Sequence, residues 1–159
     1  MTKTRSRSKP QKKRPNPAAA KGLVLAFGTF DLLHPGHLFY LAKAKKLGSK
    51  LVVIVARDAN VRHFKGQLPV NSEKTRLNVV GSLKDVDHAV LGQRSNFFDI
   101  IKEFNPKIVA LGYDQWPGRQ KLRKYLDDHL IPAKIVRLPA YKIRIYKSTH
   151  IKNKIKKTR

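Results

Sequence analysis

The sequence of 159 residues predicts an α/β fold: one Rossmann-like, doubly wound parallel sheet of five strands with helices on both faces. Short apolar runs, typical of strands buried on both faces, alternate with segments whose apolar residues recur at helical spacing. Such alternation implies β-α-β units with right-handed crossovers and parallel strands. The length fits a single domain, which we expect over residues 22–157.

The first expected strand is the apolar run over residues 23–27, which ends at Gly28. Residues 37–47 carry apolar side chains at helical spacing, and Gly48 follows them as a residue that commonly ends helices. The run LVVIV over residues 51–55 predicts the second strand. These three elements form the first β-α-β unit.

The middle of the chain continues the same alternation. Ser72 is a suitable N-cap for a helix that we expect to run to Leu83. Residues 88–91 predict a third strand. Residues 97–104 predict a helix, because the Asn-Pro pair that follows disfavours further helix.

The last third of the chain adds two strands and two helices. Residues 108–111 form an apolar run that closes at a glycine, and residues 134–138 form the fifth expected strand. Residues 119–129 are expected to be helical and to connect them. A short terminal helix is expected over residues 148–156. No internal repeat interrupts this order.

Charge is concentrated at the two ends of the chain. The protein has 35 Lys and Arg against 10 Asp and Glu, a net charge of +25. Residues 1–21 carry eight basic and no acidic residues, and residues 129–159 carry ten and none. We expect residues 1–21 to be a disordered basic tail, because they have too few apolar side chains to offset the entropy of ordering. Both ends are expected to attract polyanions or simply to aid solubility.

Composition excludes several classes of protein. No stretch approaches the roughly 20 apolar residues that span a bilayer, and the basic N-terminus lacks the apolar core of a secretory signal. The sequence contains no cysteine, which excludes a disulfide scaffold, thiolate-bound zinc and a cysteine nucleophile. We therefore expect a cytoplasmic protein that does not contact membranes.

The segment after the first strand is the strongest candidate site, because ligands of open parallel sheets bind beyond the carboxyl ends of the strands. Gly28 lets the chain turn, and Gly36 allows close approach of backbone to a ligand. The helix expected near His37 offers free N–H groups and a positive dipole end to an anion. His34 lies three residues earlier, so both imidazoles can face one bound group.

Two other interpretations of these histidines stay open. A pair near a turn can serve as capping groups or occur by coincidence. Zinc needs a further ligand, and Asp31 is the one candidate close in sequence. The combination of strand end, glycine turn, two histidines and helix start favours phosphate.

The residues Gly28-Thr29-Phe30-Asp31 and His34-Pro35-Gly36-His37 resemble the cytidylyltransferase-like nucleotidyltransferases, whose hallmark is HxGH. The resemblance extends over residues 23–155. Lys65 matches the family lysine, in an expected loop after the second strand, and Arg76 matches the helix arginine. Lys147-Ser148-Thr149 resembles the ISST-type motif at the start of the last helix, with Lys147 in place of the usual serine.

The segment Leu111-Gly112-Tyr113-Asp114-Gln115 resembles archaeal-type FAD synthases within that family. The resemblance implies transfer of AMP from ATP to FMN, giving FAD and pyrophosphate, with Mg²⁺ held mostly by phosphates and water. No protein metal ligand is expected. Dimers are common in the family, so a homodimer is a further expectation, although the sequence does not fix the oligomeric state.

The resemblance also implies roles for individual residues. The implied catalytic residues are His34, His37, Lys65 and Arg76. Those implied to bind the nucleotide are Thr29, Phe30, His34, Pro35, Gly36, His37, Asp114, Tyr141, Ser148 and Thr149. Those implied to bind the second substrate are Asp31, Lys65 and Arg76.

Two alternatives to this function remain at the level of sequence. One is a CTP-dependent cytidylyltransferase acting on a small phosphorylated alcohol such as glycerol 3-phosphate, with the same catalytic residues and another base pocket. The other is a nucleic-acid-binding protein that keeps the fold and uses its basic tails, in which case binding falls steeply with salt.

Overall fold

The computed structural model describes residues 22–115 and 118–158. The basic tail expected over residues 1–21 lies outside the described residues. Within them, five parallel strands form one sheet in the order β3-β2-β1-β4-β5. Their bounds are β1 Leu23–Gly28, β2 Lys50–Val55, β3 His88–Leu91, β4 Ile108–Leu111 and β5 Lys134–Arg137.

Apolar side chains explain why the central strands form. Leu23 to Phe27 and Leu51 to Val55 are all buried, as expected of parallel strands covered on both faces. Strand β1 lies between β2 and β4, so the order of connection reverses between β1 and β4. The predicted α/β fold is confirmed.

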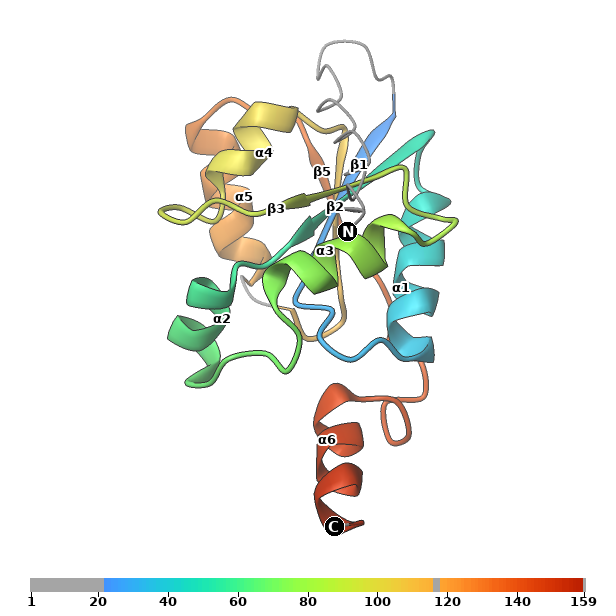
Figure 1. Cartoon of the computed structure of the whole chain (residues 1–159). Helices are drawn as coiled ribbons and strands as arrows, with labels where there is room; N and C mark the ends of the chain where they lie inside the picture. The colour runs from blue at the N-terminus through green and yellow to red at the C-terminus, as the bar shows by residue number, and fades with distance from the viewer. Residues whose placement is uncertain (1–21, 116–117, 159) are drawn as a thin grey trace, which may run out of the picture.

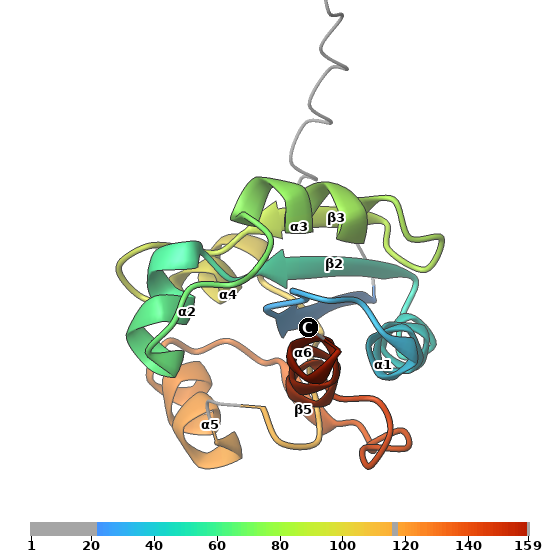
Figure 2. The same ribbon diagram turned by 60° about the horizontal axis from the view of Figure 1, so that its bottom comes forward.

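Helices cover both faces of the sheet within the described residues. Their bounds are α1 Pro35–Lys45, α2 Asp58–Lys65, α3 Glu73–Gly81, α4 Asp99–Phe104, α5 Arg119–Asp128 and α6 Ser148–Lys157. Helices α1 and α3 pack on one face through residues such as Leu41 and Val80. Helices α4 and α5 pack on the other face through residues such as Ile101 and Leu122 (Figures 1 and 2).

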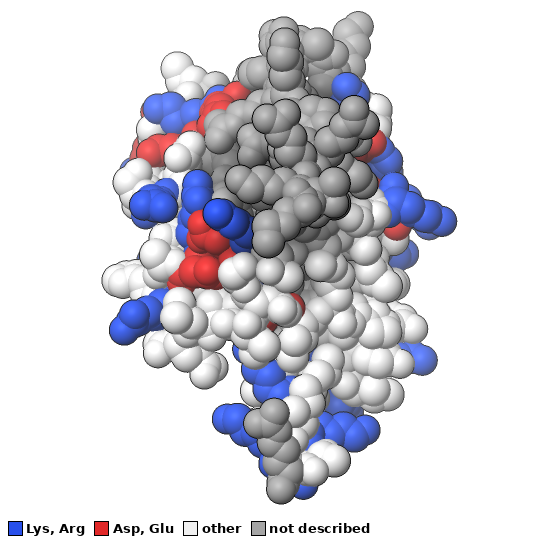
Figure 3. Space-filling view, viewed as in Figure 1, with Lys and Arg blue, Asp and Glu red and all other residues white. Residues whose placement is uncertain are grey.

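Helix α6 differs from the others because none of its residues is buried. It extends away from the body of the protein (Figure 1), and the view in Figure 2 looks along it in front of the sheet. Lysine and arginine side chains surround it (Figure 3). Among the described residues, no helix combines the length and the apolar character needed to cross a membrane.

One expectation about secondary structure was wrong, and several expected helix bounds differ from the structure by two residues. Residues 58–65 were expected to be loop but form α2. Helix α1 begins at Pro35 rather than near His37, with His34 as its N-cap. Proline is favoured at the first position of a helix because its missing N–H would have no partner there. Ser72 is the N-cap of α3 as predicted, and its hydroxyl accepts from the Thr75 N–H.

Candidate active site

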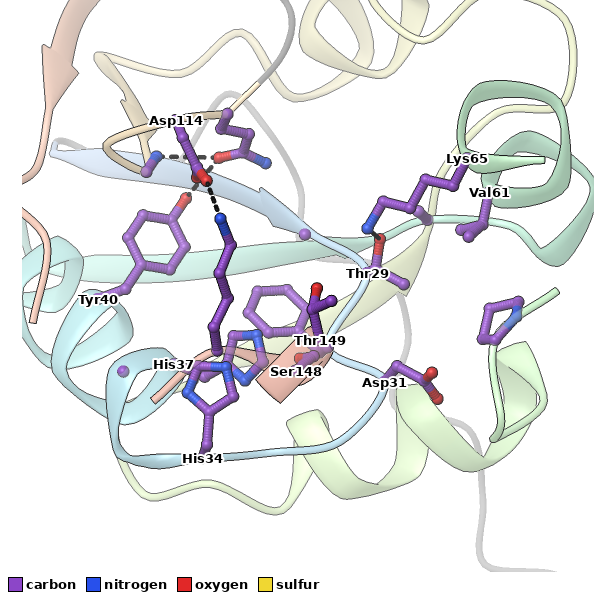
Figure 4. A pocket seen from close by; sticks show the side chains of 18 of the residues that line it. Thr29, Asp31, His34, His37, Tyr40, Val61, Lys65, Asp114, Ser148 and Thr149 are labelled. Carbon is purple, nitrogen blue, oxygen red and sulfur yellow. Dashed lines mark hydrogen bonds and ion pairs between the residues drawn. The ribbon is translucent and has the colours of Figure 1, made fainter. Parts of the chain in front are cut away.

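A cavity of about 810 Å³ opens at the carboxyl ends of the strands. It is lined by the loop after β1, the start of α1, helix α2, the turn after β4 and the face of α6 that carries Ser148 (Figure 4). The cavity therefore lies at the reversal of strand order between β1 and β4, where open parallel sheets bind their ligands.

The histidine pair lies in the wall of this cavity. His34 is the N-cap of α1 and His37 is its third residue, so both belong to the first turn. Their rings stack with centroids 3.8 Å apart and planes at 23°. A Cβ atom at Gly36 would lie 2.9 Å from the His34 ring, so glycine at this position leaves room for that ring.

Both rings have a buried nitrogen without a protein partner. Within the described residues, the Nδ1 atoms of His34 and His37 neither accept nor donate a hydrogen bond. Burial lowers the pKa of His34. Burial, together with the charges of His34 and Lys65, lowers the pKa of His37 to about 3. His37 is therefore neutral at pH 7 and offers one N–H donor and one acceptor nitrogen.

The loop after β1 is held in an unusual conformation beside these rings. Phe30 has a φ of 52°, and its buried ring lies edge-on against His37 with centroids 5.3 Å apart. A Cβ atom at Gly28 would lie 2.6 Å from the Phe30 ring. Glycine at position 28 and the buried Phe30 therefore fix the course of the loop and support His37.

Lys65 reaches the same loop from α2. Its Nζ donates to Thr29 Oγ1 at 3.2 Å, and Figure 4 shows it crossing toward the loop from the side opposite the histidines. Burial and the charge of Lys152 lower the pKa of Lys65, while Asp31 opposes them. A cation so placed can pair with phosphate on the α2 side of the cavity.

The structure does not bring Arg76 to the cavity. Its side chain is fully buried, and its guanidinium donates to the carbonyl oxygens of Asn71, Thr29 and Ala56 and to Asp58 Oδ1. Four of its five N–H groups therefore have protein acceptors. In this arrangement Arg76 joins the start of α2 and the loop before α3 to the loop that carries Thr29.

Asp31 lies in the cavity wall but its carboxylate already has partners. It accepts from the N–H groups of Val70 and Asn71, both at 2.9 Å, and from Lys152 Nζ at 2.7 Å. Burial raises its pKa, but the hydrogen bonds from Asn71, Lys152 and Val70 outweigh this effect and leave the pKa below its usual value. Asp31 therefore anchors the loop before α3 and helix α6.

Asp114 lies on the turn after β4, at the other end of the cavity. It is exposed and forms an ion pair with Lys147 at 3.7 Å. The next residue, Gln115, donates from Nε2 to Phe27 O at 2.7 Å and accepts from the Gly112 N–H at 3.0 Å. Gln115 thus fixes the turn that presents Asp114 to the cavity.

The remaining expected residues come from α6 and the segment before it. Ser148 and Thr149 are the first two residues of α6 and line the cavity, as Lys147 does. The Tyr141 ring also lines the cavity and stacks between Phe39 and Tyr146, with centroids 4.9 Å and 5.9 Å away. Pro35, at the start of α1, is exposed and does not line the cavity.

Comparison with known proteins bears directly on these motifs. Residues 25–154 match the family model described as "Cytidylyltransferase-like". The chain belongs to this family. It is 48% identical to the FAD synthase of Methanosarcina mazei over 80% of this chain and 83% of that protein. It is 44% identical to the FAD synthase of Methanoculleus marisnigri over 86% of this chain and 90% of that protein.

Solved structures give a consistent result. A protein from Thermoplasma volcanium, described as a lipopolysaccharide core biosynthesis protein, superposes with a TM-score of 0.73 at 42% identity. The match covers 76% of this chain and 98% of that one. Pantothenate synthetase from Thermus thermophilus shares the fold alone, with a TM-score of 0.58 at 16% identity over 87% of this chain and 67% of that one.

Several cavity residues of this cytidylyltransferase-like protein were not expected from the sequence. Lys152 and Lys156 line the cavity on the same face of α6 as Ser148. The spacing of four residues between them could have indicated a shared helical face. Val61, Phe64 and Leu68 line the opposite side. The signal of Val61 and Phe64 was hidden because the segment 58–65 was expected to be loop, and Leu68 lies in the loop that follows α2.

The carboxylates of this cytidylyltransferase-like cavity do not form a metal cage. In residues 22–115 and 118–158, no group of three His, Asp or Glu side chains could hold a metal ion. Asp31 and Asp114, which both line the cavity, each have a lysine partner. This donor set suits a hard cation that keeps most of its ligands as phosphate oxygens and water, as Mg²⁺ commonly does.

Proposed function

We propose that this protein is an FAD synthase, which transfers the adenylyl group of ATP to FMN and releases pyrophosphate. Its similarity to curated FAD synthases of several archaea, at 43–48% identity over most of the chain, supports the reaction. The position of the cavity at the strand ends supports a nucleotide substrate. We also propose that residues 22–157 act as one nucleotidyltransferase domain.

One structural observation carries the proposal: two stacked imidazoles, each with a buried and unpartnered Nδ1 among the described residues, at the start of a helix. Buried polar groups normally have hydrogen-bond partners. A group that accepts hydrogen bonds would satisfy these rings and would benefit from the positive end of α1. The triphosphate of ATP is such a group.

The chemistry requires no activated nucleophile. A phosphate oxygen of FMN attacks the α-phosphorus of ATP, the bond from that phosphorus to the oxygen bridging the β-phosphate breaks, and pyrophosphate leaves. The second pKa of a phosphate monoester is about 6, so the attacking oxygen is largely ionised at pH 7. Catalysis then depends on bringing two polyanions together and stabilising charge in the transition state.

The histidines and Lys65 would bind the phosphate groups of ATP and FMN at the reacting centre. Neutral His34 and His37 would donate hydrogen bonds to the α- and β-phosphates. Lys65, which now donates to Thr29, would pair with the incoming FMN phosphate and the departing charge. Because this cation and these neutral donors are held by α1 and α2, they require little rearrangement when charge develops.

Helix α6 would hold the pyrophosphate end. Ser148 and Thr149 lie at its N-terminus, where free N–H groups favour an anion. Lys152, on the same face, would exchange its ion pair with Asp31 for phosphate. Arg76 would act as a positioning residue, because its donors hold the Thr29 loop rather than substrate.

The end of the cavity near β4 would bind the adenosine. The Asp114 carboxylate can accept hydrogen bonds from ribose hydroxyls, and Tyr141 provides an aromatic ring in the wall of the same cavity. Mg²⁺ would be held mostly by triphosphate oxygens and water, and it would neutralise phosphate charge.

The basic surface around α6 would serve these anionic substrates. Lys and Arg side chains gather on and around the helix (Figure 3), and an excess of one charge accelerates the association of ligands of opposite charge. Polyanion binding by the tails would be a separate property.

The direct test incubates the purified chain with FMN and either ATP or CTP, and separates the flavins by chromatography. We expect FAD and an equal amount of pyrophosphate with ATP, and far less product with CTP. Product from CTP and glycerol 3-phosphate, without FAD from ATP and FMN, would identify the cytidylyltransferase alternative. Salt-sensitive binding of nucleic acid without pyrophosphate release would identify the nucleic-acid-binding alternative.

A further inference from the structure

An apolar wall lies on the α2 side of the cavity. Phe64 and Leu68 both line the cavity, yet their side chains are 56% and 55% exposed. Val61 and Ile54, which also line the cavity, extend the apolar surface inward and are buried. Large apolar side chains gathered on one exposed surface commonly mark a ligand-binding groove.

This wall adjoins the cation that faces the reacting centre. Lys65 directly follows Phe64 in α2, and its Nζ lies 3.2 Å from Thr29 Oγ1. Val61 lies one helical turn before Lys65, and Figure 4 shows both side chains on the cavity side of α2. A ligand with its phosphate at Lys65 would therefore have its other end within reach of the apolar wall.

The loop after α2 is held in place as part of this wall. Gly66 ends α2 with a φ of 73°, and the N–H groups of Val70 and Asn71 donate to the buried Asp31 carboxylate. Leu68 lies between these two fixed points. The position of Leu68 is therefore linked to the loop after β1, which carries the reacting groups.

We propose that the surface formed by Val61, Phe64 and Leu68 binds the isoalloxazine ring of FMN and makes the protein selective for a flavin over a small phosphorylated alcohol. The inference rests on the proposed function. The ribityl chain of FMN separates a large planar ring, apolar at its dimethylbenzene end, from a phosphate. The cavity offers a matching pair of features, because the apolar wall suits the ring and Lys65 suits the phosphate.

The two ends of the cavity differ in polarity, and the difference favours the flavin ring at the α2 end. The β4 end offers the polar side chains of Asp114 and Lys147, which suit ribose and phosphate. A purine has polar edges that lose hydrogen bonds against an apolar wall. A flavin can place its apolar end there and bury the exposed side chains of Phe64 and Leu68. Glycerol 3-phosphate would leave them in water.

The first test measures steady-state FAD formation by Phe64→Ala and Leu68→Ala. Aromatic stacking on a planar ring contributes a factor of roughly ten in affinity. We expect KM for FMN to rise about tenfold in Phe64→Ala, less in Leu68→Ala, while KM for ATP stays within about twofold. Val79→Ala, an exposed apolar residue of α3 outside the cavity, is the matched control and should leave both KM values unchanged.

The second test reports proximity rather than activity. Tryptophan quenches flavin fluorescence on close contact, so Phe64→Trp should quench bound FMN more strongly than the wild type and keep its affinity. Val79→Trp should add no quenching. Equal quenching in Phe64→Trp and the wild type, together with an unchanged KM for FMN in Phe64→Ala, would overturn the assignment.

These outcomes separate the two proposals. A wild-type protein that makes FAD while Phe64→Ala and Leu68→Ala keep the wild-type KM for FMN would overturn the ring site and leave the proposed function standing. A wild-type protein that makes no FAD would overturn both. If Phe64→Ala instead changed the oligomeric state measured by light scattering and left FMN binding unchanged, the surface would be an interface between copies of the chain.

Discussion

Lys152 Nζ on α6 lies 2.7 Å from Asp31 Oδ2 in the loop after β1. A second ion pair, between Lys147 and Asp114 at 3.7 Å, joins the start of α6 to the turn after β4. Helix α6 buries none of its residues. The two ion pairs link it to the loops at the strand ends through lysine side chains that are themselves exposed or half-buried. Both lysines line the cavity and can exchange a carboxylate for a phosphate.

Removing the ammonium of Lys152 should weaken ATP binding. We expect Lys152→Ala to raise KM for ATP about tenfold, because a charge-assisted hydrogen bond contributes roughly 1.5–3 kcal/mol. Lys152→Arg should restore much of the affinity. Lys154→Ala, on the same helix but outside the cavity, is the matched control. Steady-state kinetics with varied ATP measure this effect, and equal KM values for the Lys152→Ala and Lys154→Ala variants would argue against it.

Replacing Arg76 should lower the stability of the fold. Arg76→Ala leaves Asp58 and three backbone carbonyl groups without their donor, so we expect the free energy of unfolding to fall by about 3–5 kcal/mol. Lys74→Ala, an exposed neighbour on α3, should change it by less than about 0.5 kcal/mol. Urea unfolding measures both variants. An Arg76→Ala protein with wild-type stability and lost activity would instead favour direct contact with phosphate.

The depressed pKa of His37 predicts how stability depends on pH. Its folded pKa of about 3 lies below the usual 6.5, so the unfolded chain binds a proton that the folded protein excludes. The free energy of unfolding should therefore fall as pH drops below 6.5, with His37 accounting for about 2 kcal/mol between pH 7 and pH 5. Urea unfolding at several pH values should give a shallower dependence for His37→Gln. An equal dependence in both proteins would contradict the burial of this ring.

Gly36 should be sensitive to a single added methyl group. A Cβ atom there would meet the His34 ring at 2.9 Å, so Gly36→Ala should displace that ring and lower kcat at least tenfold. Gly81→Ala in α3 meets only Ala89 Cβ, at the ordinary distance of 3.6 Å. That control should keep its activity and gain up to about 1 kcal/mol of stability. Wild-type kcat in Gly36→Ala would show that the ring position does not matter.

The fold could be predicted because its strands are dominated by one local signal. The runs over residues 23–27 and 51–55 are continuously apolar, and burial on both faces of the sheet requires that pattern. Helix α2 lacked such a signal because Val61 is its only buried residue. Its start depends on a distant contact: the Asp58 N–H donates to Glu73, and the Glu73 N–H donates back to Asp58.

Site residues that belong to a local motif could be predicted from the sequence. Those whose roles depend on tertiary contacts could not. The motif from His34 to His37 lies within one turn of chain, and the structure places both rings in the cavity. A sequence cannot distinguish a buried arginine from a solvated one, so the interior position of Arg76 was not foreseen. Lys152 was grouped with the basic C-terminus because only the path of α6 brings it to Asp31.

Pyrophosphate release from ATP and FMN by the His34→Ala and His37→Ala variants tests the role of the paired imidazoles most directly. We expect kcat to fall roughly 10²- to 10³-fold in each variant, as when a donor to a developing negative charge is removed. The melting temperature should fall only by the loss of the ring contacts with each other and with Phe30, because neither Nδ1 has a hydrogen-bond partner among the described residues. His150→Ala, exposed on α6, should keep wild-type turnover. Full turnover in His34→Ala and His37→Ala would contradict the proposed site.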